Sequence, residues 1–297
     1  CLLYNNIKPI FADINPDTYN IEPDEIEKKI TSNTKVIIPV HFAGLACDMK
    51  RIKKIADGHN IKVIEDAAHA IGSYYADGNP VGNCKYSAMT VFSFHPVKTI
   101  TTGEGGAVTT NDEVLYKRLL QLRSHGMTKD PQLLTQNPGT WYYEMHSLGF
   151  NYRMTDIQAA LGCSQLEKLS RFRERRQYIV NQYNKAFAGI PHIKTPYNNT
   201  KFVSCFHLYV LQIDFEQLGK SRKDVMKELG NSGIGTQVHY IPVHTQPYYK
   251  EHFNYKSGDY PIAEKYYEKA LSIPLYPAMS NDDVQKVIDI LKGIIRK

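Results

Sequence analysis

The sequence predicts an α/β fold: a mostly parallel central sheet covered by helices, followed by a smaller α+β domain. Two observations support this expectation. Residues 7–126 alternate short β-branched stretches with amphipathic helical stretches. From about residue 155 that alternation gives way to one long helical stretch, which suits a helix connecting two domains. We therefore expect a large domain at residues 1–165, and a connecting helix with a small domain at residues 166–297.

The first part of the chain supplies the strands of the expected sheet and the helices between them. A proline and acidic residues open one helical stretch and lysines close it, as helix termini prefer. Because short links join strand to helix, we expect most strands to run parallel. The predicted strands are IKPIFADI (7–14), KVIIPV (35–40), KVIED (62–66), AMTVFSF (88–94) and GGAVTTND (105–112). The predicted helices are EPDEIEKKI (22–30), DMKRIKKIADGHN (48–60) and DEVLYKRLLQLRSHG (112–126).

The second part begins with the long helical stretch at residues 155–187, which Thr155 is placed to cap and which is interrupted at most once. Beyond it, a loop rich in Gly, Pro and Asn is predicted at 189–200. Strands are then predicted at FHLYVLQID (206–214) and GTQVHYI (235–241), and helices at SRKDVMKELGNSGI (221–234) and NDDVQKVIDILKGII (281–295).

Composition and charge exclude several functional classes. The net charge of +6 is mild, and Lys and Arg are spread over helices, so solvated helix faces are favoured over nucleic-acid contact. No apolar run is long enough to cross a bilayer. The five cysteines are scattered without a CxxC pair, which predicts reduced thiols in the cytoplasm rather than disulfides or a zinc site. The chain opens at Cys1 on an apolar run, and we expect a shortened N-terminus.

Polar residues follow two neighbouring strands at their carboxyl ends, where ligands gather in parallel sheets. Asp66 and His69 follow one strand, and Ser93 and Lys98 follow the next. Two of them have ordinary alternatives: Asp66 as the cap of a turn, and Lys98 as a solvated loop residue. Together they match the needs of a pyridoxal phosphate site: an amine, a carboxylate for the pyridine nitrogen, and hydroxyl or backbone donors for the phosphate.

Four stretches resemble a known family: IEDAAHAIGS, FSFHPVKTITTGEGGAVTTND, LRSHGM and GFNYRMTDIQAALGCSQL. In this order they are similar to the DegT/DnrJ/EryC1/StrS sugar aminotransferases, and the match runs over nearly the whole chain. The resemblance implies a fold-type I, aspartate aminotransferase-like enzyme that uses pyridoxal 5′-phosphate. Family members begin several dozen residues earlier, with a phosphate-binding Gly-Thr/Ser turn and an aromatic residue that stacks on the ring.

The resemblance also implies roles for single residues. Lys98 corresponds to the Schiff-base lysine and Asp66 to the partner of the pyridinium nitrogen. His69 lies near the phenolic oxygen and Ser93 binds the phosphate. Asn151 reaches the phosphate of a neighbouring subunit's cofactor, which implies a homodimer with shared active sites. Some relatives carry histidine in place of the lysine and are dehydratases, so Lys98 favours amino transfer.

The substrate expectation rests on TQVHYIPVHTQPYY (236–249), where His239, Tyr240 and His244 cluster. In the family this loop borders the sugar-nucleotide site. With RSHGM it is most similar to the transaminases that make UDP-4-amino-4,6-dideoxy-N-acetyl-β-L-altrosamine for pseudaminic acid. The resemblance thus implies L-glutamate as amino donor and the C4 ketone of a UDP-linked 4-keto-6-deoxy sugar as acceptor. A Tyr-rich core edge and a zinc pair of His239 and His244 are alternatives, the latter poorly supported without a Cys or acidic partner.

Two further interpretations of the function stay open. An aminotransferase for another keto sugar, or a pyridoxal phosphate dehydratase or synthase, has the same fold, and product analysis separates these. A non-catalytic homologue would bind the cofactor without turnover. Neither reading calls for a metal, a nucleic acid or a membrane.

Overall fold

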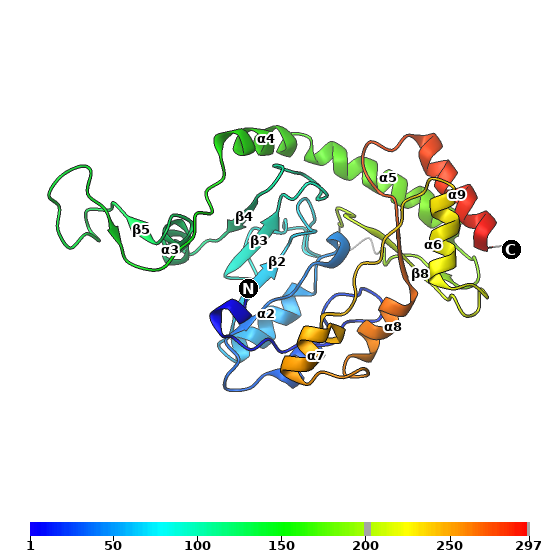
Figure 1. Ribbon diagram of the computed structural model, residues 1–297, viewed down its shortest axis with the longest axis horizontal. Coiled ribbons are helices and arrows are strands. Elements are labelled where there is room, and N and C mark those ends of the chain that lie inside the picture. Colours follow the sequence, from blue (N-terminus) through cyan, green and yellow to red (C-terminus); the bar gives the residue numbers. More distant parts are fainter. Residues whose placement is uncertain (199–202, 296–297) are drawn as a thin grey trace.

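The computed structural model describes residues 1–198 and 203–295. Its central sheet has the strand order β1-β2-β3-β4 (Figure 1). Strands β1 (Val36–Ile37), β2 (Lys62–Asp66) and β3 (Met89–Ser93) run parallel to one another. Strand β4 (Gly106–Thr109) is antiparallel to β3. The prediction of a mostly parallel sheet is confirmed, and its carboxyl edge lies at Asp66 and Ser93.

Helices α1 (Pro23–Lys29), α2 (Met49–Gly58) and α3 (Glu113–Arg123) form where the sequence predicted them. Helix α2 begins where the Asp48 carboxylate accepts a hydrogen bond from the Arg51 backbone N–H, and it buries Met49, Ile52 and Ala56. These side chains pack with Val63 of β2 in one apolar cluster. That packing fixes β2, and with it the position of Asp66.

The strand predicted at residues 7–14 is wrong. Only Ile14 pairs, through a single bridge to Ile21. Pro9 has no N–H to donate to a strand ladder. The Asp13 carboxylate instead accepts hydrogen bonds from the backbone N–H groups of Ile262 and Ala263. The segment is therefore tied by a side chain to the start of a distant helix. A 3-10 turn at Leu3–Asn5 precedes it.

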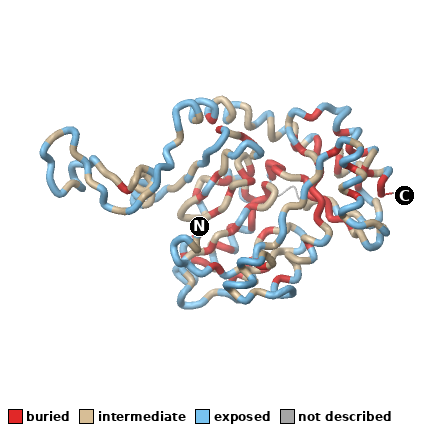
Figure 2. Tube along the Cα trace, viewed as in Figure 1, coloured by how far each residue is buried: buried red, intermediate tan, exposed pale blue. Residues whose placement is uncertain are grey.

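After α3 the chain leaves the body as a long excursion, here called the arm (residues 127–150), seen projecting at the left of Figure 1. The arm contains the short antiparallel strands β5 (Met127–Thr128) and β6 (Glu144–Met145). Most of it is exposed or half-buried (Figure 2). Its apolar side chains therefore lack a covering layer in the single chain.

The long helical stretch forms α4 (Asp156–Leu166) and α5 (Leu169–Phe187), with the single expected interruption. Thr155 caps α4 as predicted, in a capping box that also uses the Gln158 side chain. Helix α5 then crosses to the C-terminal part (Figure 1), where Ile179 and Tyr183 are fully buried.

The C-terminal part has an antiparallel sheet of β7 (Ile193–Lys194), β8 (Tyr209–Ile213) and β9 (Ala270–Ile273), in that order. Helices α6 (Arg222–Asn231) and α9 (Asn281–Ile295) match their predictions. Helices α7 (Pro247–Phe253) and α8 (Pro261–Lys269) and strands β7 and β9 were not predicted. Further 3-10 turns lie at Phe42–Gly44 and Val243–Thr245.

The strand predicted at residues 235–241 is wrong. Gln237 alone pairs, with Ser272. The His239 carbonyl accepts its hydrogen bond from the Tyr266 hydroxyl rather than from a neighbouring strand. The segment is therefore a loop, held in place by the side chain of Tyr266 on α8.

Two large apolar clusters divide the chain. One lies within residues 26–92, and the other within residues 179–295, where α5, α6 and α9 pack on β8 and β9. On this ground we propose the division at residues 165 and 166. Of the loop predicted at 189–200, residues 193–194 form β7 and residues 199–200 lie outside the described part. Within the described part, no helix combines the length and apolar character that a bilayer crossing needs.

Candidate active site

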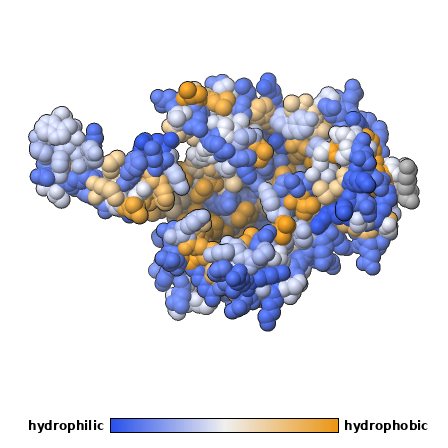
Figure 3. All heavy atoms as spheres, in the orientation of Figure 1, coloured by the Kyte–Doolittle hydropathy of each residue, from blue (hydrophilic) through white to orange (hydrophobic). Residues whose placement is uncertain are grey.

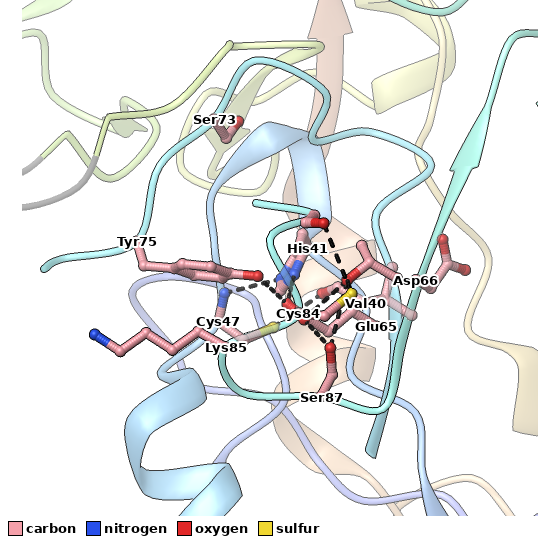
Figure 4. A network of polar contacts seen from close by, with 12 residues as sticks. Val40, His41, Cys47, Glu65, Asp66, Ser73, Tyr75, Cys84, Lys85 and Ser87 are labelled. Atoms are coloured by element: carbon pink, nitrogen blue, oxygen red, sulfur yellow. Dashed lines mark hydrogen bonds and ion pairs between the residues drawn. The ribbon is translucent and has the colours of Figure 1, made fainter. Parts of the chain in front are cut away.

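A buried polar network lies under the carboxyl end of β2 (Figure 4). At its centre is Glu65, which is fully buried. Its two carboxylate oxygens accept four hydrogen bonds, from His41 Nε2 (2.7 Å), Tyr75 Oη (2.7 Å), Ser87 Oγ (2.5 Å) and Thr90 Oγ1 (3.1 Å). These bonds join β2 to the elements around it, so the strand that carries the next residue, Asp66, is held rigidly.

Successive side chains on a strand point to opposite faces, so Asp66 points away from this network, as Figure 4 shows. Its Oδ1 accepts a hydrogen bond from the Ala68 backbone N–H at 3.0 Å, which is the turn-capping role of the ordinary alternative. Its backbone is fixed by bonds to Pro39 and His41. Oδ2 has no hydrogen-bond partner among the described residues, so capping leaves half of the carboxylate for a ligand.

Lys98 lies in the turn that follows β3. Its backbone N–H bonds to the His95 carbonyl, and Thr101 and Thr102 both bond to the Phe94 carbonyl, which fixes the loop. The side chain is half-buried. Burial lowers the pKa of Lys98, and the Asp66 carboxylate opposes this shift. The amine is thus held near Asp66 in surroundings that favour its neutral, nucleophilic form.

Histidines from three separate segments surround this amine. The rings of His69 and His207 lie 4.5 Å apart between centroids, and both residues are buried. Burial, with the nearby Lys98 and His239, lowers the pKa of His69 to about 3. Burial and then Lys98 also lower the pKa of His239. These histidines are therefore uncharged at neutral pH, and they add no positive charge beside Lys98.

Tyr240 closes one side of this group. Its hydroxyl lies 3.4 Å from His69 Nε2, and the two rings are stacked with centroids 6.2 Å apart. Burial and the Asp66 carboxylate raise the pKa of Tyr240, so its hydroxyl keeps its proton. His239 beside it is held by Ser272, through a 2.7 Å contact between Nδ1 and Oγ. The loop at residues 239–240 therefore faces the space around Lys98 and Asp66.

The other three predicted site residues are Ser93, Asn151 and His244. Ser93 is at the end of β3, where its Oγ accepts a long 3.4 Å hydrogen bond from the His95 backbone N–H. Asn151 is exposed just beyond the arm, where its backbone pairs with Ser124. His244 is buried with Nε2 bonded to Glu264 Oε1 at 2.8 Å, among the rings of Tyr255 and Tyr260. Its role in substrate binding stays a prediction.

His207 is the residue of this group that sequence reasoning missed. It lies two positions before β8 and was absorbed into a predicted strand. A histidine at the start of a mostly apolar stretch, FHLYVLQI, is the signal that could have marked it. Its neighbour Arg176, also buried, donates from Nη1 to the carbonyls of Phe206, His207 and Leu275, and so fixes the backbone there.

The residues present fit pyridoxal phosphate. The buried Nδ1 of His69 and Nδ1 of His207 have no hydrogen-bond partner among the described residues. Lys98 Nζ and Asp66 Oδ2 are likewise without one in that part of the chain. Buried polar atoms normally have partners, so the two histidine nitrogens are groups that a polar ligand would satisfy, beside the amine and carboxylate that it would also meet. In residues 1–198 and 203–295 there is no group of three or more His, Cys, Asp or Glu suited to a metal ion.

Comparison with known proteins supports the family that the sequence motifs indicated. The model of the DegT/DnrJ/EryC1/StrS aminotransferase family matches residues 1–292. The spore coat polysaccharide biosynthesis protein SpsC of Bacillus subtilis is 42% identical over 296 residues, which cover 99% of this chain and 75% of SpsC. Among solved structures, PseC of Helicobacter pylori, an aminotransferase involved in the biosynthesis of pseudoaminic acid, has a TM-score of 0.91 at 32% identity. That match covers 99% of this chain and 76% of PseC.

Another solved relative is known both with and without its cofactor. Spr1654 of Streptococcus pneumoniae is known in PLP, PMP and apo forms. Its PLP form has a TM-score of 0.88 at 32% identity, covering 99% of this chain and 77% of Spr1654.

Proposed function

Because the chain belongs to the DegT/DnrJ/EryC1/StrS aminotransferase family, we propose that it moves an amino group from L-glutamate to a UDP-linked 4-keto-6-deoxy sugar. The protein is a pyridoxal-phosphate-dependent sugar aminotransferase with a fold-type I architecture. The resemblance predicted from the motifs is thereby confirmed. The observation that supports the site is the convergence of Lys98, Asp66 and His69: the buried Nδ1 of His69 lacks a partner within the described residues, and the pKa of Lys98 is lowered by burial with Asp66 nearby.

Bound pyridoxal phosphate supplies an aldehyde that carries the amino group and a ring that withdraws electrons from the reacting carbon. Lys98 Nζ would bind that aldehyde and, once free, move a proton at the substrate carbon. Its lowered pKa favours both tasks, because only the neutral amine can attack or accept a proton. Asp66 Oδ2 would hold a proton on the ring nitrogen. His69 would donate to an oxygen on the same ring, and Ser93 would bind the phosphate.

The substrate proposal draws on the relatives and on the loop at residues 239–240. PseC acts in the biosynthesis of pseudoaminic acid, and SpsC in that of a spore coat polysaccharide. His239 and Tyr240 face the space beside Lys98, where they would contact a sugar. Since SpsC has the higher identity, an aminotransferase for a different keto sugar is the second candidate.

We also propose a homodimer, supported by the uncovered apolar side chains of the arm. Leu148 is 84% exposed, Trp141 70% and Phe150 58%. Hydrophobic residues gather where the arm joins the body (Figure 3). Such a surface is typical of one that is covered in an assembly. Asn151 follows directly, so a second copy on the arm would receive Asn151 close to its own surface.

The dimer is tested by Leu148→Arg, which places a charge in that surface. Sedimentation should show a dimer for the native chain and a shift toward monomer for the variant. Val203→Arg, an exposed apolar residue in the C-terminal part, is the matched control and should stay dimeric. A native chain that sediments as a monomer at all concentrations contradicts the proposal.

The amine is tested by borohydride reduction of the protein with pyridoxal phosphate, followed by peptide mass mapping. A pyridoxyl group is expected on the peptide that contains Lys98. Lys98→Ala should lose both this group and turnover, whereas Lys250→Ala, an exposed lysine in α7, should keep both. Normal turnover by Lys98→Ala would overturn the assignment.

The substrate is tested by mass spectrometry of the products from L-glutamate and UDP-linked 4-keto-6-deoxy sugars. An amino sugar with release of 2-oxoglutarate supports the proposal. A dehydrated sugar without an added amino group indicates a dehydratase. Cofactor binding without any product indicates a non-catalytic homologue. We propose that the enzyme works in the cytoplasm, because its five cysteines are unpaired.

A further inference from the structure

A second cavity lies apart from the residues around Lys98. It has a volume of about 460 Å³ and opens between residues 16–19, strands β7 and β8, and helix α8. This volume is within the usual range for small-molecule sites, roughly 300–1,000 Å³. None of the residues that line it is one of those predicted for the cofactor or the sugar.

The floor of this cavity holds a buried amide without a partner. Gln212 lies in β8, where all five residues are buried. Leu211 and Ile213 pack in the apolar cluster beneath α5 and α9, so Gln212, between them, points to the opposite face and lines the cavity. It is 8% exposed, and its Nε2 has no hydrogen-bond partner among the described residues. A buried N–H₂ group left in this state is costly, which indicates that something else satisfies it.

The charges around the cavity sum to a positive value. Lys194 pairs with Asp17 at 2.7 Å, and Lys269 pairs with Asp214 at 2.6 Å. Lys265, which also lines the cavity, has no carboxylate partner in the described part of the chain. Two neutralised pairs and one free ammonium leave one positive charge for a ligand.

Aromatic rings form one wall. Tyr19 and Tyr266 both line the cavity, and their centroids lie 4.5 Å apart. Tyr19 has a positive φ of 59°, an unusual conformation for a tyrosine, and its ring lies against Tyr266 and beneath Lys194. Ile193 and Ile262 add apolar surface. The wall therefore suits the flat or apolar body of a small molecule.

We propose that this cavity is a second ligand site, which binds a small anion whose apolar body carries an uncharged hydrogen-bond acceptor. The acceptor takes the free N–H of Gln212, the carboxylate or phosphate meets Lys265, and the body lies against Tyr19 and Tyr266. The site does not depend on the identity of the sugar substrate.

The site is physically connected to the active site through Tyr266. The Tyr266 ring lines the cavity, and its hydroxyl donates to the His239 carbonyl at 2.7 Å. His239 in turn lies near enough to Lys98 for that charge to lower its pKa. A ligand in the cavity therefore touches the residue that holds the active-site loop.

Binding is measured by isothermal titration calorimetry on the cofactor-loaded enzyme, so that the cofactor site is already filled. The probes are 4-acetamidobenzoate and 4-acetamidophenyl phosphate, which share a ring and a carbonyl acceptor and differ in the anion. Acetanilide, which lacks the anion, is the control ligand. At least one anionic probe should bind with one-to-one stoichiometry, and acetanilide about tenfold more weakly.

Variants locate the binding. Lys265→Ala and Gln212→Leu should each weaken binding about tenfold. Lys227→Ala, an exposed lysine on α6, should leave it unchanged. Gln212→Leu should also unfold at a higher temperature than the native chain, because it removes an unpartnered buried amide. Lys265→Ala changes only an exposed side chain, so it still locates the binding site if Gln212→Leu fails to fold. No binding by either anion, or equal binding by native chain and Lys265→Ala, overturns the proposal.

Discussion

A substitution at Glu65 tests how far the buried network under Asp66 stabilises the N-terminal part of the chain. Substituting Glu65→Gln keeps the shape of the side chain but removes its charge. His41 Nδ1 accepts a hydrogen bond from the Cys47 backbone N–H, so Nε2 carries the proton that His41 donates to Glu65. The charge of Glu65 is thus stabilised by four hydrogen-bond donors.

The expected loss follows from those four bonds. A hydrogen bond to a charged group contributes about 1.5–3 kcal/mol and a neutral one about 0.5–1.5 kcal/mol. The Ser87 and Thr90 hydroxyls can rotate to accept from the new amide, which offsets part of the loss. We expect Glu65→Gln to lower the free energy of unfolding by about 2–4 kcal/mol. At ~2.1 cal/mol/K per residue, 3 kcal/mol lowers Tm by ~5 °C if the whole chain unfolds together, and by ~9 °C if the N-terminal part unfolds alone.

The dependence on pH has a definite sign. Burial by itself raises the pKa of Glu65, but the hydrogen bond and electrostatic attraction of His41, with hydrogen bonds from Ser87 and Tyr75, outweigh it, and the pKa lies below its usual value. Its contribution is fully present above the unfolded-state pKa, about 4.3, and is lost as pH falls through the folded-state value. The difference between native chain and variant should therefore be largest near neutral pH and shrink in acid.

Urea unfolding followed by circular dichroism measures this difference at pH 7 and at decreasing pH. Glu251→Gln, an exposed glutamate on α7, is the control and should match the native chain. The reasoning is refuted if Glu65→Gln loses less than about 1 kcal/mol at pH 7. A difference that grows as the pH falls would contradict the sign of the pKa shift.

Three further predictions concern the site. Asp66→Asn should fold normally but transfer amino groups at least about 100-fold more slowly, because the ring nitrogen loses its proton-holding partner; near-native turnover contradicts this. His244→Ala should lower Tm without changing KM for the sugar, because His244 is bonded to Glu264 inside the protein; a raised KM at unchanged Tm would instead support substrate binding. Burial lowers the pKa of Lys98 from 10.5. The rate at which the apoenzyme captures pyridoxal phosphate should therefore rise with pH, with a midpoint below pH 10.5. A midpoint of this pH profile at or above 10.5 argues against the buried environment of Lys98.

Much of the fold was predictable because local patterns agree with the tertiary structure. The helix at residues 281–295 and the strand at 62–66 form within the predicted bounds, since their apolar periodicity is also the face that packs. The two failed strands, at 7–14 and 235–241, have strand-like composition, but side chains bond to their backbone groups instead of a neighbouring strand. In the first, the Ile14 N–H donates to the Asp13 carboxylate and the Pro9 carbonyl accepts from the Tyr255 hydroxyl; in the second, the His239 carbonyl accepts from the Tyr266 hydroxyl.

For the site, the sequence alone determined the residue types and the edge of the sheet at which they meet. Asp66 and Lys98 follow neighbouring strands, and parallel strands bring their carboxyl ends together. Only the tertiary structure decided that His207 lies against His69, that His244 is bonded to Glu264, and that Gln212 faces a cavity. These contacts join segments far apart in the sequence, and no local periodicity records which of them will meet.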